Sequence, residues 1–323
     1  MPKAVLVRET GGPEVLEYVD VEPRKPGAGE LVVAVRAAGV NYIDTYHRSG
    51  QYPMELPFRL GSEGAGVVTA VGEDVTGFAV GDRVAWHGAG GSYAEETVVH
   101  AAGALHVPEG VDDDTAAATL LQGLTAHYLA ASTYPIHAGD TVLVHAAAGG
   151  VGLLLTQLAK SRGARVIGTV STAEKEALAR EAGADEVIRY TEVDFVAEVK
   201  RLTDGVGVHA VYDGVGKDTF DGSLSVLKPR GYLVLYGASS GPVPPVDPQR
   251  LNAGGSLFLT RPTLGHYVAT REELEWRAGE LFAAIQDGSL KVAVGGRYPL
   301  SEAHRAHEDL QGRKTTAKLL LIP

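Results

Sequence analysis

The stretch HAAAGGVG, residues 145–152, has the residue types and spacing of a turn that holds a phosphate group. Aligned on the dinucleotide fingerprint G-x-G-x-x-G, it places Ala147, Gly149 and Gly152 at the three fingerprint positions. Gly149 would let the backbone approach a pyrophosphate, and Gly152 would let the following helix pack closely on the preceding strand. An ordinary tight turn is the alternative. A buried strand before the turn and an amphipathic helix after it favour the dinucleotide site.

The end of the next expected strand, GTVST at residues 168–172, indicates which dinucleotide is bound. An NAD site expects Asp or Glu there, bonded to the ribose 2′-hydroxyl. No acid is present, and Lys175 follows within one helical turn. A lysine beside the hydroxyl of Ser171 would bind a 2′-phosphate, and Tyr190, just after the following strand, would add its own hydroxyl. The pattern predicts NADPH; the alternative is that Lys175 is only a solvated helix charge.

Metal chemistry has little support in the sequence. The chain contains no cysteine, which excludes disulfides, a thiol nucleophile, iron–sulfur clusters and zinc sites with cysteine ligands. His304 and His307 stand one helical turn apart beside Glu308, a spacing that two metal ligands can have. Charged residues surround them, so we expect a solvated helix face there and no metal.

The elements that position these residues change in type near residue 115. Before it the chain is rich in strands and glycine, with strands expected at 32–35, 64–71 and 83–86, as in a compact barrel. Asp113 to Ser132 then carries apolar residues at helical spacing. Strands and helices alternate afterwards, which predicts a doubly wound parallel sheet. We expect strands at 141–145, 165–170, 186–188, 208–212, 232–236 and 256–260, and helices at 151–160, 172–181 and 218–227.

The alternation stops after Pro262. A long helix is expected at 271–287, a shorter one at 301–310 and a last strand at 318–322. This tail cannot extend the doubly wound pattern, so we expect it to return to the first domain. The fold class is therefore α/β, with a parallel nucleotide-binding domain at 119–261 inserted into a β-rich domain made of 1–118 and 262–323.

Composition sets the broad class of protein. The chain has 323 residues, a prior of about two domains. Its formal net charge of −11 repels phosphate backbones, so we expect no nucleic-acid partner and no anionic membrane surface. No apolar run reaches the ~18 residues of a membrane span, and residues 1–10 do not resemble a secretory signal. We therefore expect a cytoplasmic protein.

Several motifs resemble the medium-chain dehydrogenase/reductase superfamily. They are HAAAGGVG, QGLTAHY (122–128), RLGSEGAGVV (59–68) and VGDRV (80–84). The segments GGPEVL (11–16), GVNYIDTYHRSGQYP (39–53) and RAHEDLQGRKTT (305–316) are similar to its quinone oxidoreductase, or ζ-crystallin-like, branch. The resemblance covers the whole chain and implies a Rossmann domain inserted into a GroES-like catalytic domain.

The resemblance also implies the chemistry of the site. Where zinc-using members place a cysteine and a histidine, this chain has Asn41 and Ser62, and only Glu63 remains of the zinc-associated motif. It implies a zinc-free enzyme in which NADPH supplies the reducing equivalents to a quinone and no single side chain is indispensable. Asn41, Tyr46 and Tyr52 would bind the substrate. Cofactor contacts would come from Asn41, Tyr42, Asp44, Tyr46, Thr125, Tyr128, Gly149, Gly150, Val151, Ser171, Lys175, Tyr190, Val215, Gly237, Ala238, Ser239, Gly241 and Arg313.

Other functions remain open at this point. Reduction of an enone or another activated double bond would use the same motifs, and each of the tyrosines could be a packing residue. A non-catalytic NADPH-binding or RNA-binding protein is a further alternative, although the net charge of −11 and the lack of a basic stripe argue against RNA. The sequence does not distinguish one-electron from two-electron transfer.

The last strand of the inserted sheet predicts a partner. SLFLT, residues 256–260, carries no charge, and its apolar residues 257–259 suggest burial on both faces. An uncovered apolar edge strand is an aggregation hazard. We expect the same strand of a second copy to pair with it about a two-fold axis, and the family resemblance implies the same homodimer.

Overall fold

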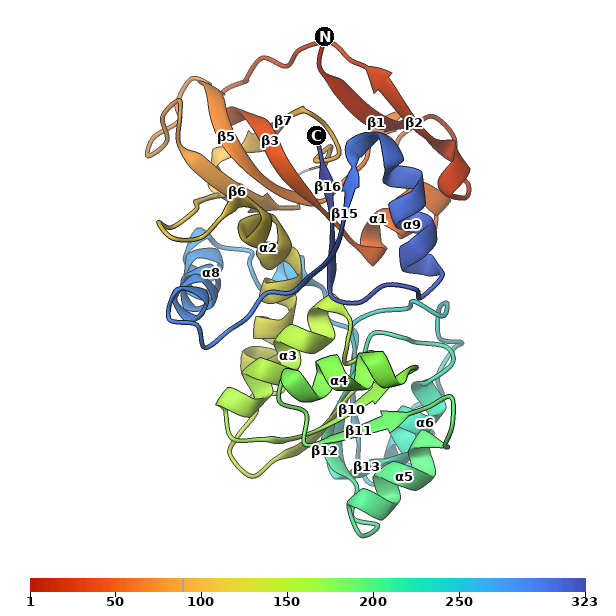
Figure 1. Cartoon of the computed structure of the whole chain (residues 1–323). Helices are drawn as coiled ribbons and strands as arrows, with labels where there is room; N and C mark the ends of the chain where they lie inside the picture. The colour runs from red at the N-terminus through yellow and green to blue at the C-terminus, as the bar shows by residue number, and fades with distance from the viewer. Residues whose placement is uncertain (89) are drawn as a thin grey trace. The chain divides into compact units, whose positions relative to one another are not determined.

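The computed structural model describes residues 1–88 and 90–323 and divides into two compact units (Figure 1). The terminal unit contains residues 1–122 and 268–323, and the central unit contains residues 123–267. Folding domains with boundaries at 118/119 and 261/262 remain our proposal.

The central unit is built on one parallel sheet of six strands in the order β11-β10-β9-β12-β13-β14. This is the 3-2-1-4-5-6 order of a Rossmann fold, in which the order reverses between the first and fourth strands, here β9 and β12. Buried apolar runs such as 142–144 explain why these segments form inner strands. The strands are β9 (Thr141–Val144), β10 (Arg165–Val170), β11 (Glu186–Arg189), β12 (Val208–Asp213), β13 (Leu227–Leu235) and β14 (Phe258–Thr260).

Helices connect the parallel strands of this sheet (Figure 1). α3 packs beside α4, and α5 packs beside α6, as right-handed crossovers on either side of a switch point require. Leu227 is in β13, so the helix expected at 218–227 is shorter than predicted at both ends, and the helix α5 was not predicted. The helices are α3 (Gly150–Ser161), α4 (Ala173–Glu181), α5 (Phe195–Leu202), α6 (Phe220–Ser225) and α7 (Gln249–Ala253).

The terminal unit is β-rich, as the sequence predicts. Its larger sheet has the order β15-β16-β3-β5-β6-β8, with β7 also paired to β3. A smaller sheet has the order β2-β1-β4. Apolar side chains such as Val33, Trp86 and Leu321 fill the core of the unit. The strands are β1 (Lys3–Val7), β2 (Leu16–Asp20), β3 (Glu30–Val40), β4 (Phe58–Arg59), β5 (Glu63–Val71), β6 (Arg83–His87), β7 (Glu96–His100), β8 (Ala104–His106), β15 (Val294–Pro299) and β16 (Lys318–Ile322).

The C-terminal tail returns to this unit, which confirms that the Rossmann sheet is an insertion. β16 pairs antiparallel with β3, with Leu320 opposite Gly39. The first residue of α8, Arg271, donates to the Ala104 carbonyl at 2.6 Å. The helices α1 (Tyr42–Ser49), α8 (Arg271–Gln286) and α9 (Ala303–Gln311) belong to this unit, while α2 (Asp113–Tyr128) runs across its boundary at residue 122.

The edge position predicted for the SLFLT segment is confirmed, because β14 is the last strand of the central sheet. Burial on both faces is not found within the single chain. Leu257 is buried, whereas Phe258 is 48% exposed and stacks on Tyr232 with ring centroids 4.4 Å apart. The half-exposed Phe258 therefore stacks on the partly buried Tyr232 of the neighbouring strand β13 at this edge of the sheet. Among the described residues, no helix is both long and apolar enough to cross a membrane.

Candidate functional site

The predicted phosphate turn lies between β9 and α3 in the central unit. Gly149 is the N-cap of α3, and Gly149, Gly150 and Val151 are all partly exposed. A Cβ on Gly152 would lie 2.3 Å from the Ala146 carbonyl oxygen, so only glycine fits there. Because the first N–H groups of a helix have no partner within it and carry its positive end, this turn fits the phosphates of a dinucleotide.

The alanine at the first fingerprint position has a structural explanation. Ala147 is fully buried, and its Cβ faces β10 at Gly168. A Cβ on Gly168 would lie 2.8 Å from the Ala147 Cβ. Gly168 on the neighbouring strand therefore leaves room for the Ala147 side chain. The turn can pack closely on β10 although it lacks the first glycine of the fingerprint.

A buried carboxylate orders the loop that follows β12. Asp213 accepts hydrogen bonds from the backbone N–H groups of Val215 at 2.8 Å and Gly216 at 3.0 Å. Ser223 donates to the other carboxylate oxygen at 2.8 Å and lies 3.0 Å from His145 Nε2. Burial lowers the pKa of His145, so its ring is neutral near pH 7. These hydrogen bonds, which run from Asp213 through Ser223 to His145, join the ends of β9 and β12, where the order of the sheet reverses.

The predicted loop 237–241 follows β13 and lies against the loop after β12. The N–H of Ser239 donates to the Gly214 carbonyl at 3.2 Å, and the N–H of Ser240 donates to the Val215 carbonyl at 2.8 Å. The predicted residues Gly149–Val151, Val215 and Gly237–Gly241 are thus all at the carboxyl ends of β9, β12 and β13. Ligands of open α/β sheets bind at this edge.

The residues predicted for the 2′-phosphate gather at the neighbouring strand ends. Ser171 follows β10, Tyr190 follows β11, and Lys175 is in the first turn of α4. The N–H of Lys175 donates to Thr172 Oγ1, the N-cap of that helix, at 3.2 Å. Thr191 Oγ1 donates to the Ser171 carbonyl at 2.8 Å, which joins the two strand ends. A hydroxyl, a phenol and an ammonium at a helix N-terminus suit an anion.

Two other predicted cofactor residues of the central unit, Thr125 and Tyr128, are less exposed to solvent. Thr125 and Tyr128 are both buried on α2, and the Tyr128 ring stacks on Tyr267 with centroids 4.3 Å apart. Burial also raises the pKa of Tyr128, so its hydroxyl is not an acid near pH 7. Arg313 lies in the terminal unit just after α9, with a left-handed φ of 56°.

In the terminal unit, Asn41 and Glu63 belong to a buried polar cluster that the sequence did not reveal. Lys318 forms an ion pair with Glu63, and both side chains are at most 1% exposed. Lys318 Nζ also donates to Asn41 Oδ1 at 2.8 Å, and Asn41 Nδ2 donates to Glu63 Oε1 at 2.7 Å. The N–H of Leu121 donates to the other Glu63 oxygen at 2.8 Å. The cluster fixes the orientation of Asn41.

A second buried cluster surrounds Asp44. The pair Asn41 and Asp44 forms a capping box that begins α1, with the N–H of Asn41 donating to Asp44 Oδ2 at 2.9 Å. Ser62 Oγ donates to Asp44 Oδ1 at 2.6 Å, and Tyr93 donates to Oδ2 at 2.9 Å. Asp44 is fully buried, so any part it takes at the cofactor would be through the residues it bonds.

The predicted substrate tyrosines lie together on α1 and the loop after it. The rings of Tyr46 and Tyr52 meet edge to face with centroids 5.2 Å apart, and the ring centroids of Tyr42 and Tyr46 are 6.4 Å apart. Tyr52 is 37% exposed and Tyr46 is 9% exposed. This arrangement offers an aromatic wall to a flat ring, with Tyr52 as its open end.

One prediction about the tail is wrong. His307 was expected on a solvated helix face, but it is fully buried, whereas His304 is exposed. His307 Nε2 lies 3.1 Å from the Tyr93 hydroxyl, and its Nδ1 lies 3.0 Å from Arg48 Nη1. Burial and the nearby Arg48 lower the pKa of His307 to about 3. Within the described residues, no group of three or more His, Cys, Asp or Glu is placed to hold a metal ion.

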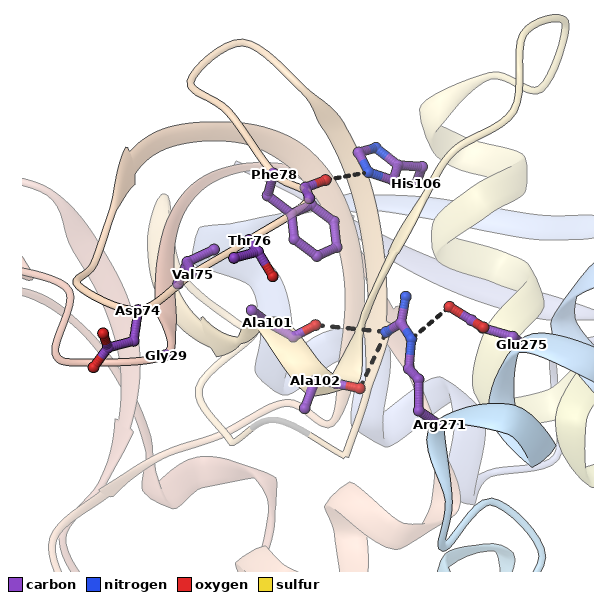
Figure 2. Close-up of a pocket in the computed structure, with 11 residues that line it drawn as sticks. Gly29, Asp74, Val75, Thr76, Phe78, Ala101, Ala102, His106, Arg271 and Glu275 are labelled. Atoms are coloured by element: carbon purple, nitrogen blue, oxygen red, sulfur yellow. Dashed lines mark hydrogen bonds and ion pairs between the residues drawn. The ribbon is translucent and has the colours of Figure 1, made fainter.

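A separate pocket of about 600 Å³ lies entirely in the terminal unit (Figure 2). It contains none of the residues predicted from the sequence. Arg271 on its wall donates to Glu275 and to the carbonyls of Ala101 and Ala102, and His106 contacts the Gly77 carbonyl. These groups satisfy one another, so we assign no ligand to the pocket.

Comparison with known proteins places the chain in a family. Residues 27–109 match the model of the alcohol dehydrogenase GroES-like domain, and residues 150–283 match that of the zinc-binding dehydrogenase. A quinone oxidoreductase of Pseudomonas aeruginosa is 50% identical, with 100% of both chains covered. A 2-haloacrylate reductase of a Burkholderia species is 41% identical, with 100% of this chain and 99% of the relative covered.

Solved structures agree with these relatives. A mycobacterial protein complexed with NADPH is 57% identical with a TM-score of 0.97, covering 99% of this chain and 100% of that one. Escherichia coli quinone oxidoreductase complexed with NADPH is 46% identical with a TM-score of 0.97 and the same coverage. The inserted Rossmann fold, the phosphate turn and these full-length likenesses lead to one assignment: the chain belongs to the quinone oxidoreductase branch of the medium-chain dehydrogenase/reductase superfamily.

Proposed function

We propose that this protein is an NADPH-dependent quinone oxidoreductase. The observation that carries the proposal is the pair of anion-binding features in the central unit: the turn at Gly149–Val151 and the hydroxyl and ammonium groups at Ser171 and Lys175. The first suits a pyrophosphate and the second a 2′-phosphate. Relatives of the same family that are named quinone oxidoreductases support the substrate class.

The protein's own residues bind and orient the reactants. Nicotinamide supplies a hydride when NADPH is bound. Gly149–Val151 would hold the pyrophosphate, and the loops ordered by Asp213 would border the dinucleotide. Tyr46 and Tyr52 would stack on the quinone ring, and Asn41, whose side chain Lys318 and Glu63 hold in place, would line the substrate site. Holding the reactants aligned and dry is the main contribution of such a site to the rate.

The test is an oxidation screen with purified protein, in which loss of NADPH is followed with a panel of quinones and enones. Turnover of quinones well above that of enones supports the proposal. The alternative is reduction of another activated double bond, which the name of the Burkholderia relative favours. Faster turnover of haloacrylates or enones than of any quinone would replace the proposal with this alternative.

We expect the reaction to be independent of a metal ion. Asn41 and Ser62 stand where zinc-using relatives place ligands. The Asn41 side chain is already hydrogen-bonded to Glu63, and the Ser62 side chain to Asp44. Dialysis against a chelator should leave the turnover rate unchanged, and elemental analysis should find no stoichiometric zinc. Activity that is lost on dialysis and restored by zinc would contradict this prediction.

We further propose a cytoplasmic homodimer that pairs through β14. The support is the edge position of that strand and the half-exposed Phe258 stacked on Tyr232. Phe258→Lys should convert a dimer into a monomer at micromolar concentration, because a charge on the strand would be buried by pairing. Light scattering checks the mass. The exposed Val206→Lys is the control and should remain dimeric; a monomeric wild-type protein would refute the pairing.

A further inference from the structure

A chain of hydrogen bonds links Arg48, through His307 and Tyr93, to Asp44, and its direction is fixed. Arg48 can only donate, so its Nη1, 3.0 Å from His307 Nδ1, makes that nitrogen the acceptor. The ring proton of His307 is then on Nε2, which donates to the Tyr93 oxygen at 3.1 Å. Tyr93 is left to donate its own proton to Asp44 Oδ2 at 2.9 Å. Every hydrogen bond in the chain therefore points toward the carboxyl group of Asp44.

This direction determines which oxygen of Asp44 can carry a proton. Oδ2 already accepts two donors that cannot reverse, the Tyr93 hydroxyl and the backbone N–H of Asn41. Among the residues that the structure describes, the Ser62 hydroxyl alone is hydrogen-bonded to Oδ1, at 2.6 Å, and a hydroxyl can turn to accept. A proton on Asp44 is thus placed on Oδ1, in a hydrogen bond to Ser62. Arg48 accepts no proton, so the proton on Asp44 can leave only through Ser62.

The surroundings let Asp44 hold that proton near neutral pH. Burial raises the pKa of Asp44 to about 6, although its donors and the Lys318 ammonium on β16 oppose the shift. The other charged or titratable groups around it are Glu63, Tyr93, His307 and Arg48. Of these, burial raises the pKa of Tyr93 and lowers that of His307, so both stay neutral and the chain keeps its direction.

We propose that Asp44 supplies, through the hydroxyl of Ser62, the proton that completes quinone reduction. The inference rests on the proposed function. A quinone that accepts a hydride gains two electrons and one proton, and needs one more proton on its oxygen to become a hydroquinone. Ser62 gives its hydroxyl proton to that oxygen and takes the proton of Asp44 Oδ1. Asp44 is left as a carboxylate and regains a proton from water by the reverse route before the next turnover.

Ser62 is placed for this task. It is 8% exposed, in contrast to the fully buried Asp44, and it shares the Asp44 carboxyl group with Asn41, a residue predicted to line the substrate site. Asp44 is a positioning residue and proton reservoir behind Ser62. Water can also protonate a hydroquinone anion, so loss of the relay slows the reaction without abolishing it.

The experiment compares the pH dependence of kcat with a direct titration of Asp44. In the wild type, kcat should fall by about tenfold as the pH rises from about 6 to about 7.5, following the protonated fraction of Asp44. Ser62→Ala and Asp44→Asn should both lose this pH dependence and stay near the high-pH rate of the wild type. Ser62→Thr, which keeps the hydroxyl, should retain it. Asp20→Asn, a surface carboxyl on β2, is the matched control and should behave as the wild type.

Infrared spectroscopy of the cofactor-free protein supplies a readout that does not depend on turnover. A protonated carboxyl band should titrate with a midpoint near 6 in the wild type and at a higher pH in Ser62→Ala, which loses the hydrogen bond from Ser62 that lowers the pKa of Asp44, and the band should be missing in Asp44→Asn. Tyr93→Phe removes a donor that favours the charged form, so both the band and the kcat profile should move up by about one pH unit.

Three results would overturn the relay. They are a Ser62→Ala enzyme that keeps the full pH dependence, a wild-type kcat that does not change over this range, and the absence of a titrating band. If Asp44→Asn does not fold, the Ser62 variants alone decide. A wild-type protein that reduces no quinone would instead refute the proposed function, and the infrared titration of Asp44 would be unaffected.

Discussion

Replacing Lys175 by alanine is expected to weaken NADPH binding by about ten- to a hundredfold and to leave NADH binding nearly unchanged. A hydrogen bond to a charged group contributes about 1.5–3 kcal/mol, and each 1.4 kcal/mol corresponds to about a tenfold change in affinity. Lys175 is in the first turn of α4, whose positive end adds to the attraction for a phosphate. The 2′-phosphate is the only group that distinguishes the two cofactors. Titration calorimetry with each cofactor measures the difference.

Two further variants separate this contact from a general effect of charge. Lys175→Arg keeps the positive charge and should retain most of the preference for NADPH. Lys200→Ala removes an exposed lysine of the same unit, on α5, and should affect neither cofactor. Equal losses for NADPH and NADH in Lys175→Ala would show that the residue supports α4 rather than the 2′-phosphate.

The central unit was predictable because its signals are local. A buried apolar run predicts an inner strand, and a glycine-rich turn between a strand and an amphipathic helix predicts a nucleotide site. β9, β10, β12 and α3 lie within a few residues of their expected limits. The exceptions are both ends of α6, the start of β13, and the short helices α5 and α7, which were not predicted. Apolar residues at 195, 196, 199 and 202 nevertheless give α5 a helical spacing, so the sequence carried a local signal for this helix that was missed.

The buried polar groups of the terminal unit could not be predicted, because their partners are far apart in the sequence. Lys318 and Glu63 are 255 residues apart, and Arg48 and His307 are 259 residues apart. Lysine, arginine and histidine side chains are usually solvated, so residue type alone predicts the wrong environment for each of these three. The one local signal is the capping box of Asn41 and Asp44, which predicts the start of α1. It does not reveal that the aspartate is buried.

Replacing Lys318 by methionine is expected to lower the free energy of unfolding by about 3–5 kcal/mol. The ammonium is buried, pairs with Glu63 and donates to Asn41 Oδ1. Its loss leaves the Glu63 carboxylate buried without a counter-charge, which is the costly outcome for a buried ion pair. Because burial lowers the pKa of Lys318, the pair itself adds less net stability than this penalty suggests. Urea denaturation of the variant measures the change.

The double variant Lys318→Met with Glu63→Gln distinguishes an orphaned charge from lost packing. It removes both charges and keeps an acceptor for the N–H of Leu121, so it should recover most of the lost stability. Lys3→Met is the matched control, because Lys3 and Asp20 form a pair of which both members are exposed, and its cost should be below about 1 kcal/mol. If Lys318→Met costs no more than Lys3→Met, or the double variant recovers nothing, the buried charge of Glu63 is not what Lys318 compensates. The orientation of Asn41 would then have to come from its hydrogen bonds to Glu63, Gln122 and the Gly39 carbonyl.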